Sequence, residues 1–137
     1  MTSKDKPLKL RIATEGDVAL SLMETIKFAQ AIGFNHQDAQ KVATAVSEIV
    51  RNVLKYAGSG GLQMSRMQNG PQIGVEVIVT DKGPGIVDVD KALTDHYTTG
   101  RSLGLGLPGV KRMMDELEIE SHLGQGTTVT FRKWQTR

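Results

Sequence analysis

A carboxylate and a carboxamide lie four residues apart in the segment SEIVRNVLKYA, at Glu48 and Asn52. On a helix this spacing puts both side chains on one face, with Arg51 beside them. An amide oxygen can bind a Mg²⁺ ion held mainly by phosphates, and a carboxylate one turn away can orient or deprotonate a nucleophile. The pattern therefore suits phosphoryl transfer. The alternative is a solvated polar edge of an amphipathic helix.

A second candidate is the segment DKGPG at residues 81–85, which directly follows the strand-like run VEVIVT. Asp81 could accept a hydrogen bond from an exocyclic amine, while Gly83 and Gly85 let a flat ring approach the backbone. The alternative is a tight turn, because Asp, Gly and Pro are common turn residues.

A third candidate is the segment GRSLGLGLPG at residues 100–109. Gly104, Leu105 and Gly106 precede a predicted helix, whose free backbone N–H groups and dipole can meet an anionic phosphate. Arg101 is either a further phosphate contact or a solvated side chain. The segment is not a Walker loop, because no Gly-Lys pair followed by Ser or Thr is present, and a flexible linker is the alternative.

The fourth segment, GQGT at residues 124–127, ends on Thr127 and by itself indicates a hairpin turn. What distinguishes the four segments is their order in one short chain. A Glu/Asn helix precedes Asp-x-Gly-x-Gly, then a glycine loop that opens a helix, then Gly-x-Gly-Thr.

Two amphipathic helices should position the first of these segments. Thr14 and Asn35 are the expected N-caps, each followed three residues later by an acid, Asp17 and Asp38, and a glycine ends each helix. The apolar stripes expected to be buried are Val18, Leu22, Ile26 and Ala29 in the first helix, and Val42, Val46, Ile49 and Val53 in the second.

The remaining segments read as strands, one loop and a third helix. Residues 8–13 alternate between apolar and basic side chains, which indicates a strand with one wet face. A hairpin is expected around residues 69–71 and another around residues 124–126. A long irregular loop is predicted over residues 81–104, followed by a helix over residues 105–117.

Alternating strands predict a sheet that is covered on one face only. We therefore expect a single α/β (α+β) domain over residues 1–137, a two-layer sandwich with three helices on one face of a mixed sheet. Aromatic residues make up 4% of the chain, so its core must come from aliphatic side chains.

Composition limits the classes of function. The formal charge of +2 is too small to indicate nucleic acid binding, and the chain has no cysteine for a disulfide or a thiolate metal site. No apolar run approaches the ~20 residues of a membrane helix, and the polar start MTSKDKPLK does not resemble a signal peptide. We expect a cytoplasmic protein with no membrane partner.

The four segments, taken together, resemble the GHKL, or Bergerat-fold, nucleotide-binding family of gyrase-like ATPases and histidine kinases. The resemblance implies ATP and Mg²⁺ as cofactors, with Asn52 as the metal ligand and Glu48 as the catalytic carboxylate. It implies that Asp81 accepts the adenine amine. It also assigns nucleotide contacts to Gly83, Gly85, Arg101, Gly104, Leu105, Gly106 and Thr127.

Within that family the chain is most similar to short bacterial serine/threonine kinases of partner switching, the RsbT-type switch kinases of stressosomes. The residues that carry this likeness are IATEGDVA, AVSEIVRNVLKYAG, DKGPGIVDV, GLGLPGVKRMMDELEIES and GQGTTVTFRKW. The likeness implies phosphorylation of Ser or Thr on STAS-domain antagonists and scaffolds, and subsequent activation of a downstream phosphatase or other output enzyme. The stretch TTGRSLG departs from the more glycine-rich lid expected of the family.

Two other functions compete with the kinase. One is an anti-sigma-like or allosteric binding module whose nucleotide pocket regulates docking without phosphate transfer. The other is a hydrolase that uses water as the acceptor and turns over ATP without a partner.

Overall fold

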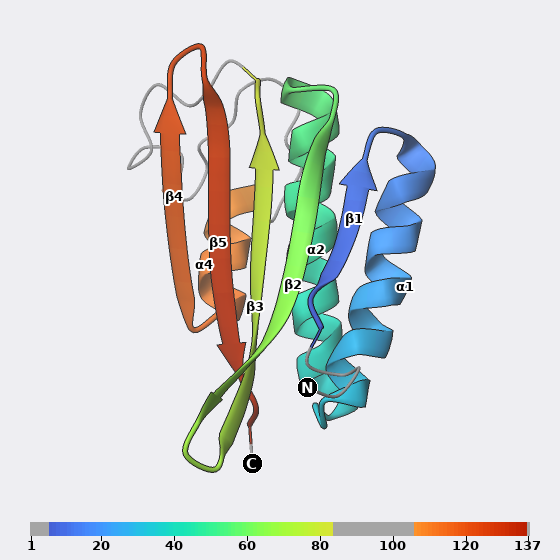
Figure 1. Cartoon of the computed structure of the whole chain (residues 1–137), viewed down its shortest axis with the longest axis vertical. Coiled ribbons are helices and arrows are strands. Elements are labelled where there is room, and N and C mark those ends of the chain that lie inside the picture. The colour runs from blue at the N-terminus through green and yellow to red at the C-terminus, as the bar shows by residue number, and fades with distance from the viewer. Residues whose placement is uncertain (1–5, 84–105, 137) are drawn as a thin grey trace.

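A computed structural model describes residues 6–83 and 106–136 of the chain. Its helices are α1 (Glu15–Ala31), α2 (His36–Tyr56) and α4 (Gly106–Met113). Its strands are β1 (Leu8–Ile12), β2 (Gly60–Asn69), β3 (Gln72–Asp81), β4 (Glu116–His122) and β5 (Gly126–Trp134). The strands form one sheet and the three helices cover one of its faces, which confirms the expected two-layer arrangement (Figure 1).

The sheet is antiparallel throughout the described residues, so the prediction of a mixed sheet is wrong. Its strand order is β1-β2-β3-β5-β4, and all four pairings are antiparallel. Two of these pairings, β2 with β3 and β4 with β5, are hairpins, which local sequence patterns predict. The other two join strands that are distant in sequence, and alternation within a strand does not indicate its partner or direction.

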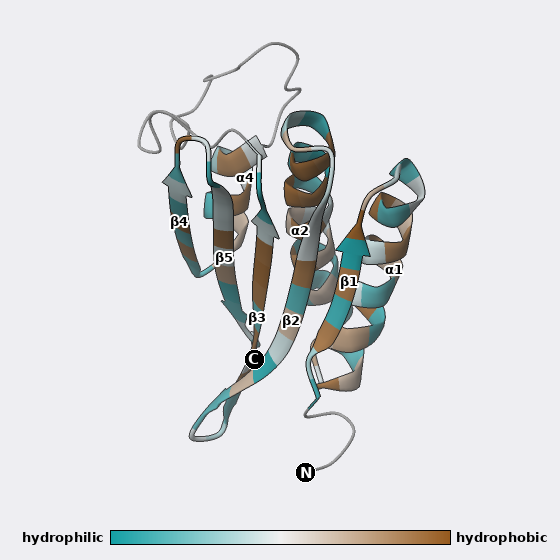
Figure 2. Ribbon diagram, turned by 45° about the horizontal axis from the view of Figure 1, so that its top comes forward, coloured by the Kyte–Doolittle hydropathy of each residue, from teal (hydrophilic) through white to brown (hydrophobic). Residues whose placement is uncertain are grey.

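The core lies between the sheet and the helices, and β3 is its central strand. Figure 2 shows apolar residues concentrated on the central strands and on the helices behind them. The largest fully buried side chains are mainly aliphatic, as the composition predicts: Phe131, Ile12, Ile49, Met64, Val42, Val46, Val50, Val75, Val77, Val79, Val110 and Thr25.

Helix α2 follows its sequence pattern closely. The Asn35 side chain accepts a hydrogen bond from the Asp38 backbone N–H at 2.8 Å, which confirms the predicted N-cap. The predicted stripe is buried, because all four of its residues are no more than 3% exposed: Val42, Val46, Ile49 and Val53.

Helix α1 departs from its predicted stripe. Val18 and Ala29 are buried as expected, but Leu22 and Ile26 are only partly buried. The buried line instead includes Ser21 and Thr25, whose hydroxyl donates to the Ser21 carbonyl at 2.6 Å. Small side chains on this line let α1 approach the neighbouring α2 closely, so packing overrides the hydrophobic pattern.

The third helix is shorter than expected. It ends at Met113, and β4 begins at Glu116 inside the segment predicted to be helical. Asp115 explains the break, because its backbone N–H donates to the Arg132 carbonyl at 2.9 Å and its carboxylate accepts from the Trp134 backbone N–H at 2.7 Å. These bonds to β5 replace the next helical turn.

The residues after β5 tie three parts of the fold together. The Gln135 backbone N–H donates to the Ile73 carbonyl at 2.8 Å, and its side-chain amide donates to the Gly33 carbonyl. The Thr136 backbone N–H donates to the Asp38 carboxylate at 2.9 Å. These three hydrogen bonds from Gln135 and Thr136 form a clamp. Its Asp38 end is buried at the start of α2, because Asp38 is 3% exposed.

The charge of Asp38 should make this clamp sensitive to pH. Burial alone would raise the pKa of the Asp38 carboxyl, but hydrogen bonds from Thr136 outweigh it and lower the pKa below its ordinary value. The positive charges of Lys133 and Lys41 lower that pKa further. The clamp is therefore strongest when Asp38 is ionised.

We expect Asp38→Asn to reduce the free energy of unfolding by about 1–2 kcal/mol near neutral pH, because asparagine keeps an acceptor but loses the charge. Since the folded-state pKa lies below the unfolded-state value, this stabilisation is present above the unfolded-state pKa. It is lost as the pH falls through the folded-state pKa. Urea unfolding of both proteins from neutral to acid pH should show the difference shrinking.

The matched control is Glu24→Gln, which removes a carboxylate from an ion pair with Lys27 on the surface, with N and O 3.7 Å apart. We expect that change to cost less than about 0.5 kcal/mol, since exposed pairs contribute little. A stability difference for Asp38→Asn that stays constant into acid would contradict the role given to its charge.

Candidate functional site

Asp81, Gly83 and Thr127 lie at one end of the sheet, and Glu48 meets Gly106 where α2 contacts α4. Asp81 is the last residue of β3, and it pairs with Gly60 on β2 and with Thr127 on β5. Helix α2 lies directly behind this end of the sheet and contacts both β3 and α4 (Figure 1). The strands β2 and β5 therefore meet at Asp81, and α2 connects this part of the fold to α4.

Glu48 links α2 to the start of α4. Its Oε2 accepts a hydrogen bond from the Gly106 backbone N–H at 3.3 Å, and its Oε1 lies 3.6 Å from Nη1 of Arg51. The Glu48 side chain is 20% exposed, so it is partly shielded but still open to a reactant. The structure thus places the predicted carboxylate beside the predicted phosphate-binding helix start.

Asn52 lies one helical turn after Glu48 and is half-buried. Among the described residues its side-chain amide makes no hydrogen bond. A half-buried amide without a partner is unusual in a helix that is otherwise well packed. The amide oxygen could bind a metal ion, and the amide NH₂ group could donate hydrogen bonds to a bound ligand.

Asp81 forms a turn and keeps one oxygen free within the described residues. Its Oδ1 accepts the Gly83 backbone N–H at 2.8 Å, and no bond to Oδ2 is found in residues 6–83 and 106–136. The sequence left two interpretations of Asp81, a turn residue and an acceptor for an amine, and the structure is compatible with both at once. One carboxylate oxygen fixes the loop while the other can accept from an amine.

Three glycines crowd around Asp81, and each excludes a side chain. A Cβ on Gly126 would collide with the Asp81 carbonyl, and its φ of +108° also favours glycine. A Cβ on Gly60 would lie 2.9 Å from Cγ1 of Val53. These contacts bring β2, β3 and β5 together at the site.

Gly83 has a packing role that the sequence did not indicate. A Cβ there would lie 2.6 Å from Cβ of Ala57, the residue that follows α2. Glycine at position 83 is therefore required for the loop to touch α2. Its predicted contact with a flat ring remains a prediction.

Thr127 is buried and belongs to a hydroxyl pair. Its Oγ1 lies 2.9 Å from Oγ of Ser121, which also donates to the Gly126 carbonyl at 3.3 Å. Sequence reasoning missed Ser121, Gly60 and the contact of Gly126 with Asp81. Each depends on which strands pair and in what register, and no local pattern carries that information.

The other predicted nucleotide contacts lie outside the described residues: Gly85, Arg101, Gly104 and Leu105. Within the described ranges, no group of three or more acidic or histidine side chains could hold a metal ion. A cation here would take its ligands from Asn52 and from a bound anion, which is how hard Mg²⁺ binds with phosphates. No described helix is long and apolar enough to cross a membrane.

Comparison with known proteins supports the resemblance seen in the sequence. Serine/threonine-protein kinase RsbT of Bacillus subtilis (strain 168) is 38% identical over 125 residues, which cover 91% of this chain and 94% of that protein. An anti-sigma F factor of Thermoanaerobacter sp. (strain X514) is 34% identical over 113 residues, 78% of each chain. The predicted likeness to RsbT-type proteins is confirmed.

Two solved structures share the fold. The RsbU and RsbW domains of a Mycobacterium tuberculosis protein align with a TM-score of 0.63 and 19% identity over 96% of this chain. This chain spans 33% of that structure. The mycobacterial sensor histidine kinase MprB aligns with a TM-score of 0.55 and 17% identity, covering 97% of this chain and 99% of that one.

The family profile of the histidine kinase-like ATPase domain matches residues 12–133, a span that includes every site residue described above. The fold likeness to the sensor histidine kinase MprB agrees with that match. The chain therefore belongs to the histidine kinase-like ATPase domain family.

Proposed function

We propose that this protein is an ATP-dependent serine/threonine protein kinase that phosphorylates a STAS-domain protein. The observation that carries the proposal is the 38% identity to a serine/threonine-protein kinase across 91% of the chain. Two contacts support it: Glu48 accepts the N–H of Gly106 at the start of α4, and Asp81 holds the turn to Gly83 at the end of β3.

ATP binding would begin at Asp81. Oδ2, which has no hydrogen bond within the described residues, would accept the exocyclic amine of adenine, while the Gly83 N–H keeps Oδ1 in place. The hydroxyl pair of Thr127 and Ser121 would support the same end of the site from the neighbouring strands. Gly85 would line the base as the chain leaves β3.

Asn52 would supply an amide oxygen to Mg²⁺, which would reduce the charge on the phosphates. No hydrogen bond to this amide is found within residues 6–83 and 106–136, which is compatible with such a role. The Gly106 N–H donates to Glu48 in the structure, and the start of α4 would present the positive end of its helix dipole to the phosphates. Gly104, Leu105 and Arg101 are proposed to complete that contact.

Glu48 would orient the incoming serine or threonine hydroxyl and accept its proton. In the structure its two oxygens lie near cationic or donor groups, the Arg51 guanidinium and the Gly106 N–H.

The pathway assignment follows from the same relative. We propose that residues 1–137 act as one ATP-binding kinase domain in the cytoplasm, within bacterial stress-response partner switching at stressosomes. The substrates would be a STAS-domain antagonist and scaffold, and the released kinase would then activate a downstream phosphatase or other output enzyme. No nucleic acid or membrane partner is proposed.

A second function is favoured by a separate observation, the 34% identity to anti-sigma F factors. In that case the nucleotide pocket would regulate docking to a partner without phosphate transfer. Incubation with radiolabelled ATP, Mg²⁺ and a purified STAS-domain partner distinguishes the two functions. A kinase labels the partner, whereas a binding module gives only nucleotide-dependent complex formation.

Glu48→Gln should reduce the rate of phosphate transfer by about 10²–10⁴-fold, because general-base catalysis contributes that much. Glutamine can still accept the Gly106 N–H, so ATP affinity should change little. Single-turnover transfer to the partner and equilibrium ATP binding measure the two effects. Transfer at the wild-type rate would remove Glu48 from the mechanism.

Asn52→Ala should abolish measurable transfer and remove the Mg²⁺ dependence of ATP binding. The expected loss of affinity appears only when Mg²⁺ is present, since the metal-free nucleotide does not need the amide. Calorimetry with and without Mg²⁺ tests this point, and Gln63→Ala on the open sheet face is the matched control. An equal loss in both conditions would indicate a structural role for Asn52.

Asp81→Asn should weaken ATP binding by about 10–100-fold, because an amide that faces the adenine amine leaves a donor opposite a donor. Asparagine keeps an oxygen for the Gly83 N–H, so the turn and the melting temperature should be preserved. Titration with a fluorescent ATP analogue, in parallel with thermal unfolding, measures both quantities. Unchanged affinity would place adenine elsewhere.

A further inference from the structure

The outward side of α2 carries a row of polar residues with Glu48 at its centre. The row consists of Lys41, Thr44, Glu48, Arg51 and Lys55, which follow one another at spacings of three and four residues. Residues at these spacings lie along one side of a helix. None of the five is buried, whereas the apolar stripe of α2 is, so the row faces away from the sheet. We call these five residues the α2 row.

Two lysines flank Glu48 at equal distances along the helix. Lys41 precedes it by seven residues and Lys55 follows it by seven. Seven residues are two helical turns, so each lysine lies about 10 Å from Glu48 along the helix axis. Both lysines are exposed, and neither makes an ion pair within the described residues. The carboxylate therefore lies midway between two cations that are available to another molecule.

Further cations and an aromatic ring extend the same surface. The Arg51 side chain, 3.6 Å from the Glu48 carboxylate, is 61% exposed against 20% for Glu48, so the guanidinium is the more accessible of the two. Nζ of Lys55 lies 5.1 Å from the centre of the Tyr56 ring, and Tyr56 is 42% exposed. Lys111 is exposed on α4, which packs beside α2. Exposed arginine and tyrosine side chains are enriched where proteins bind other proteins.

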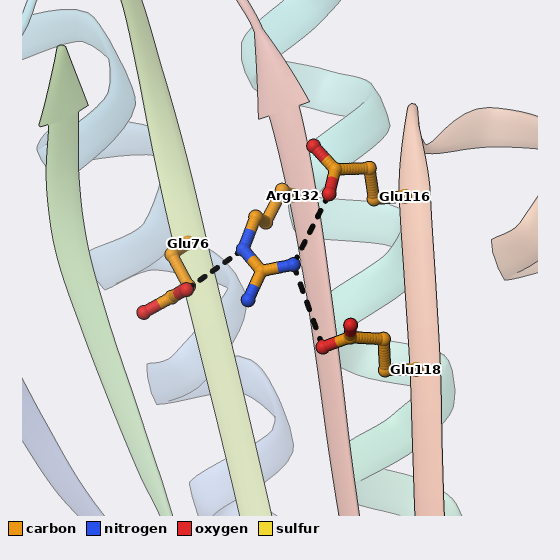
Figure 3. A network of polar contacts seen from close by, with 4 residues as sticks. All are labelled: Glu76, Glu116, Glu118 and Arg132. Carbon is orange, nitrogen blue, oxygen red and sulfur yellow. Dashed lines mark hydrogen bonds and ion pairs between the residues drawn. The ribbon is translucent and has the colours of Figure 1, made fainter. Parts of the chain in front are cut away.

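Acidic side chains of the described residues are placed away from the α2 row. Helix α4 has none, and Asp38, the other acid of α2, is buried in the clamp with Thr136. On the sheet, Arg132 lies 2.8 Å from Glu76 and 3.2 Å from Glu116. Figure 3 shows this network on the near side of the strands, with the helices beyond, so the sheet separates it from the outward side of α2. Acids that pair with the lysines of the row would therefore come from another molecule.

We infer that the α2 row docks an acidic surface of the phosphoacceptor protein, with carboxylates about 10 Å on either side of the acceptor serine or threonine. The inference rests on the proposed kinase function, in which Glu48 receives the proton of that hydroxyl. A hydroxyl at Glu48 brings its two flanks over Lys41 and Lys55, so opposite charges there set the position of the acceptor along α2. About 10 Å corresponds to three residues of an extended segment or to seven residues of a helix.

The order of charges along the row favours a protein surface over a nucleic acid. A phosphate backbone is negative along its whole length, so it would place negative charge against Glu48 as well as against the lysines. The formal charge of the whole chain is only +2, which gives little long-range attraction for a polyanion. A protein surface can instead place a neutral hydroxyl between two carboxylates, which matches the sequence of lysine, glutamate and lysine on α2.

Lys41→Glu with Lys55→Glu should raise the KM for a purified STAS-domain partner about 10–100-fold, because like charges then face each other during docking. The kcat and the affinity for ATP should change little, since neither lysine is placed at the nucleotide or at the transferred phosphate. The rise in KM should shrink as salt is added. Initial rates at varied partner concentration and equilibrium ATP binding measure these quantities. An unchanged KM, or an equal loss of ATP affinity, would overturn the inference.

Binding measured without phosphate transfer separates this inference from the proposed kinase. The dissociation constant for the same partner is measured by calorimetry in the presence of a non-hydrolysable ATP analogue. If the wild type binds the partner but never phosphorylates it, the kinase is wrong, and weaker binding by the reversal variant still supports the acidic docking surface. If the partner is phosphorylated and the reversal variant binds it as tightly as wild type, the kinase stands and the docking surface is wrong.

The matched control is Lys6→Glu with Lys27→Glu, which changes the net charge equally at exposed residues outside α2 and α4 and should leave the KM within about twofold of wild type. A second variant, Lys41→Gln with Lys55→Gln, places no acid near Asp38 and should raise the KM by a smaller factor. Melting temperatures establish that all variants are folded. If the reversal variant loses binding to a DNA or RNA duplex while its KM for the partner is unchanged, the row binds nucleic acid and the inference is overturned.

Discussion

Close backbone contact at the end of β3 is the constraint on which the candidate site depends. Asp81 is paired on both sides, and glycines at positions 60, 83 and 126 let β2, the following loop and β5 touch the surrounding backbone and α2. A side chain at any of these positions would separate the segments. Main-chain packing thus fixes the backbone of Asp81, and the hydrogen bond from the Gly83 N–H to Oδ1 gives its carboxylate a defined direction.

Helix α2 sets the distances between the other parts of the site. Its apolar stripe is buried against the sheet, so the rotation of the helix about its axis is determined. That rotation places Glu48 against the start of α4, and it places Ala57 against Gly83. One rigid element therefore positions the Glu48 carboxylate, the Asn52 amide and the loop that follows Asp81 relative to one another.

Much of this arrangement could be predicted from the sequence, because the signals were local. The caps and stripe of α2, the hairpin at residues 69–71 and the one-sided helical layer all follow from short-range patterns. The stripe of α1 could not be predicted, since close packing on α2 selects small buried residues there. The early end of α4 also depends on a distant partner, because Asp115 bonds to β5.

The residues of the candidate site also divide into those with a local sequence signal and those that depend on contacts between distant segments. Glu48, Asn52, Asp81 and Thr127 belong to segments whose composition already indicates chemistry. Ser121 has no such signal, and only its position opposite Thr127 in the register reveals it. The antiparallel order of the sheet is likewise a property of pairing between distant strands. Local patterns identify elements, whereas partners are set by the assembled fold.

The position of β5 between β3 and β4 has a consequence for the order in which the protein is made. During synthesis from the N-terminus, β3 is completed about 45 residues before β5 begins, and until then one edge of the central strand has no partner. An unpaired, apolar strand edge is prone to associate with other chains. A ribosome-bound intermediate therefore needs protection until residues 126–134 have emerged, and only then does Asp81 acquire both of its neighbours.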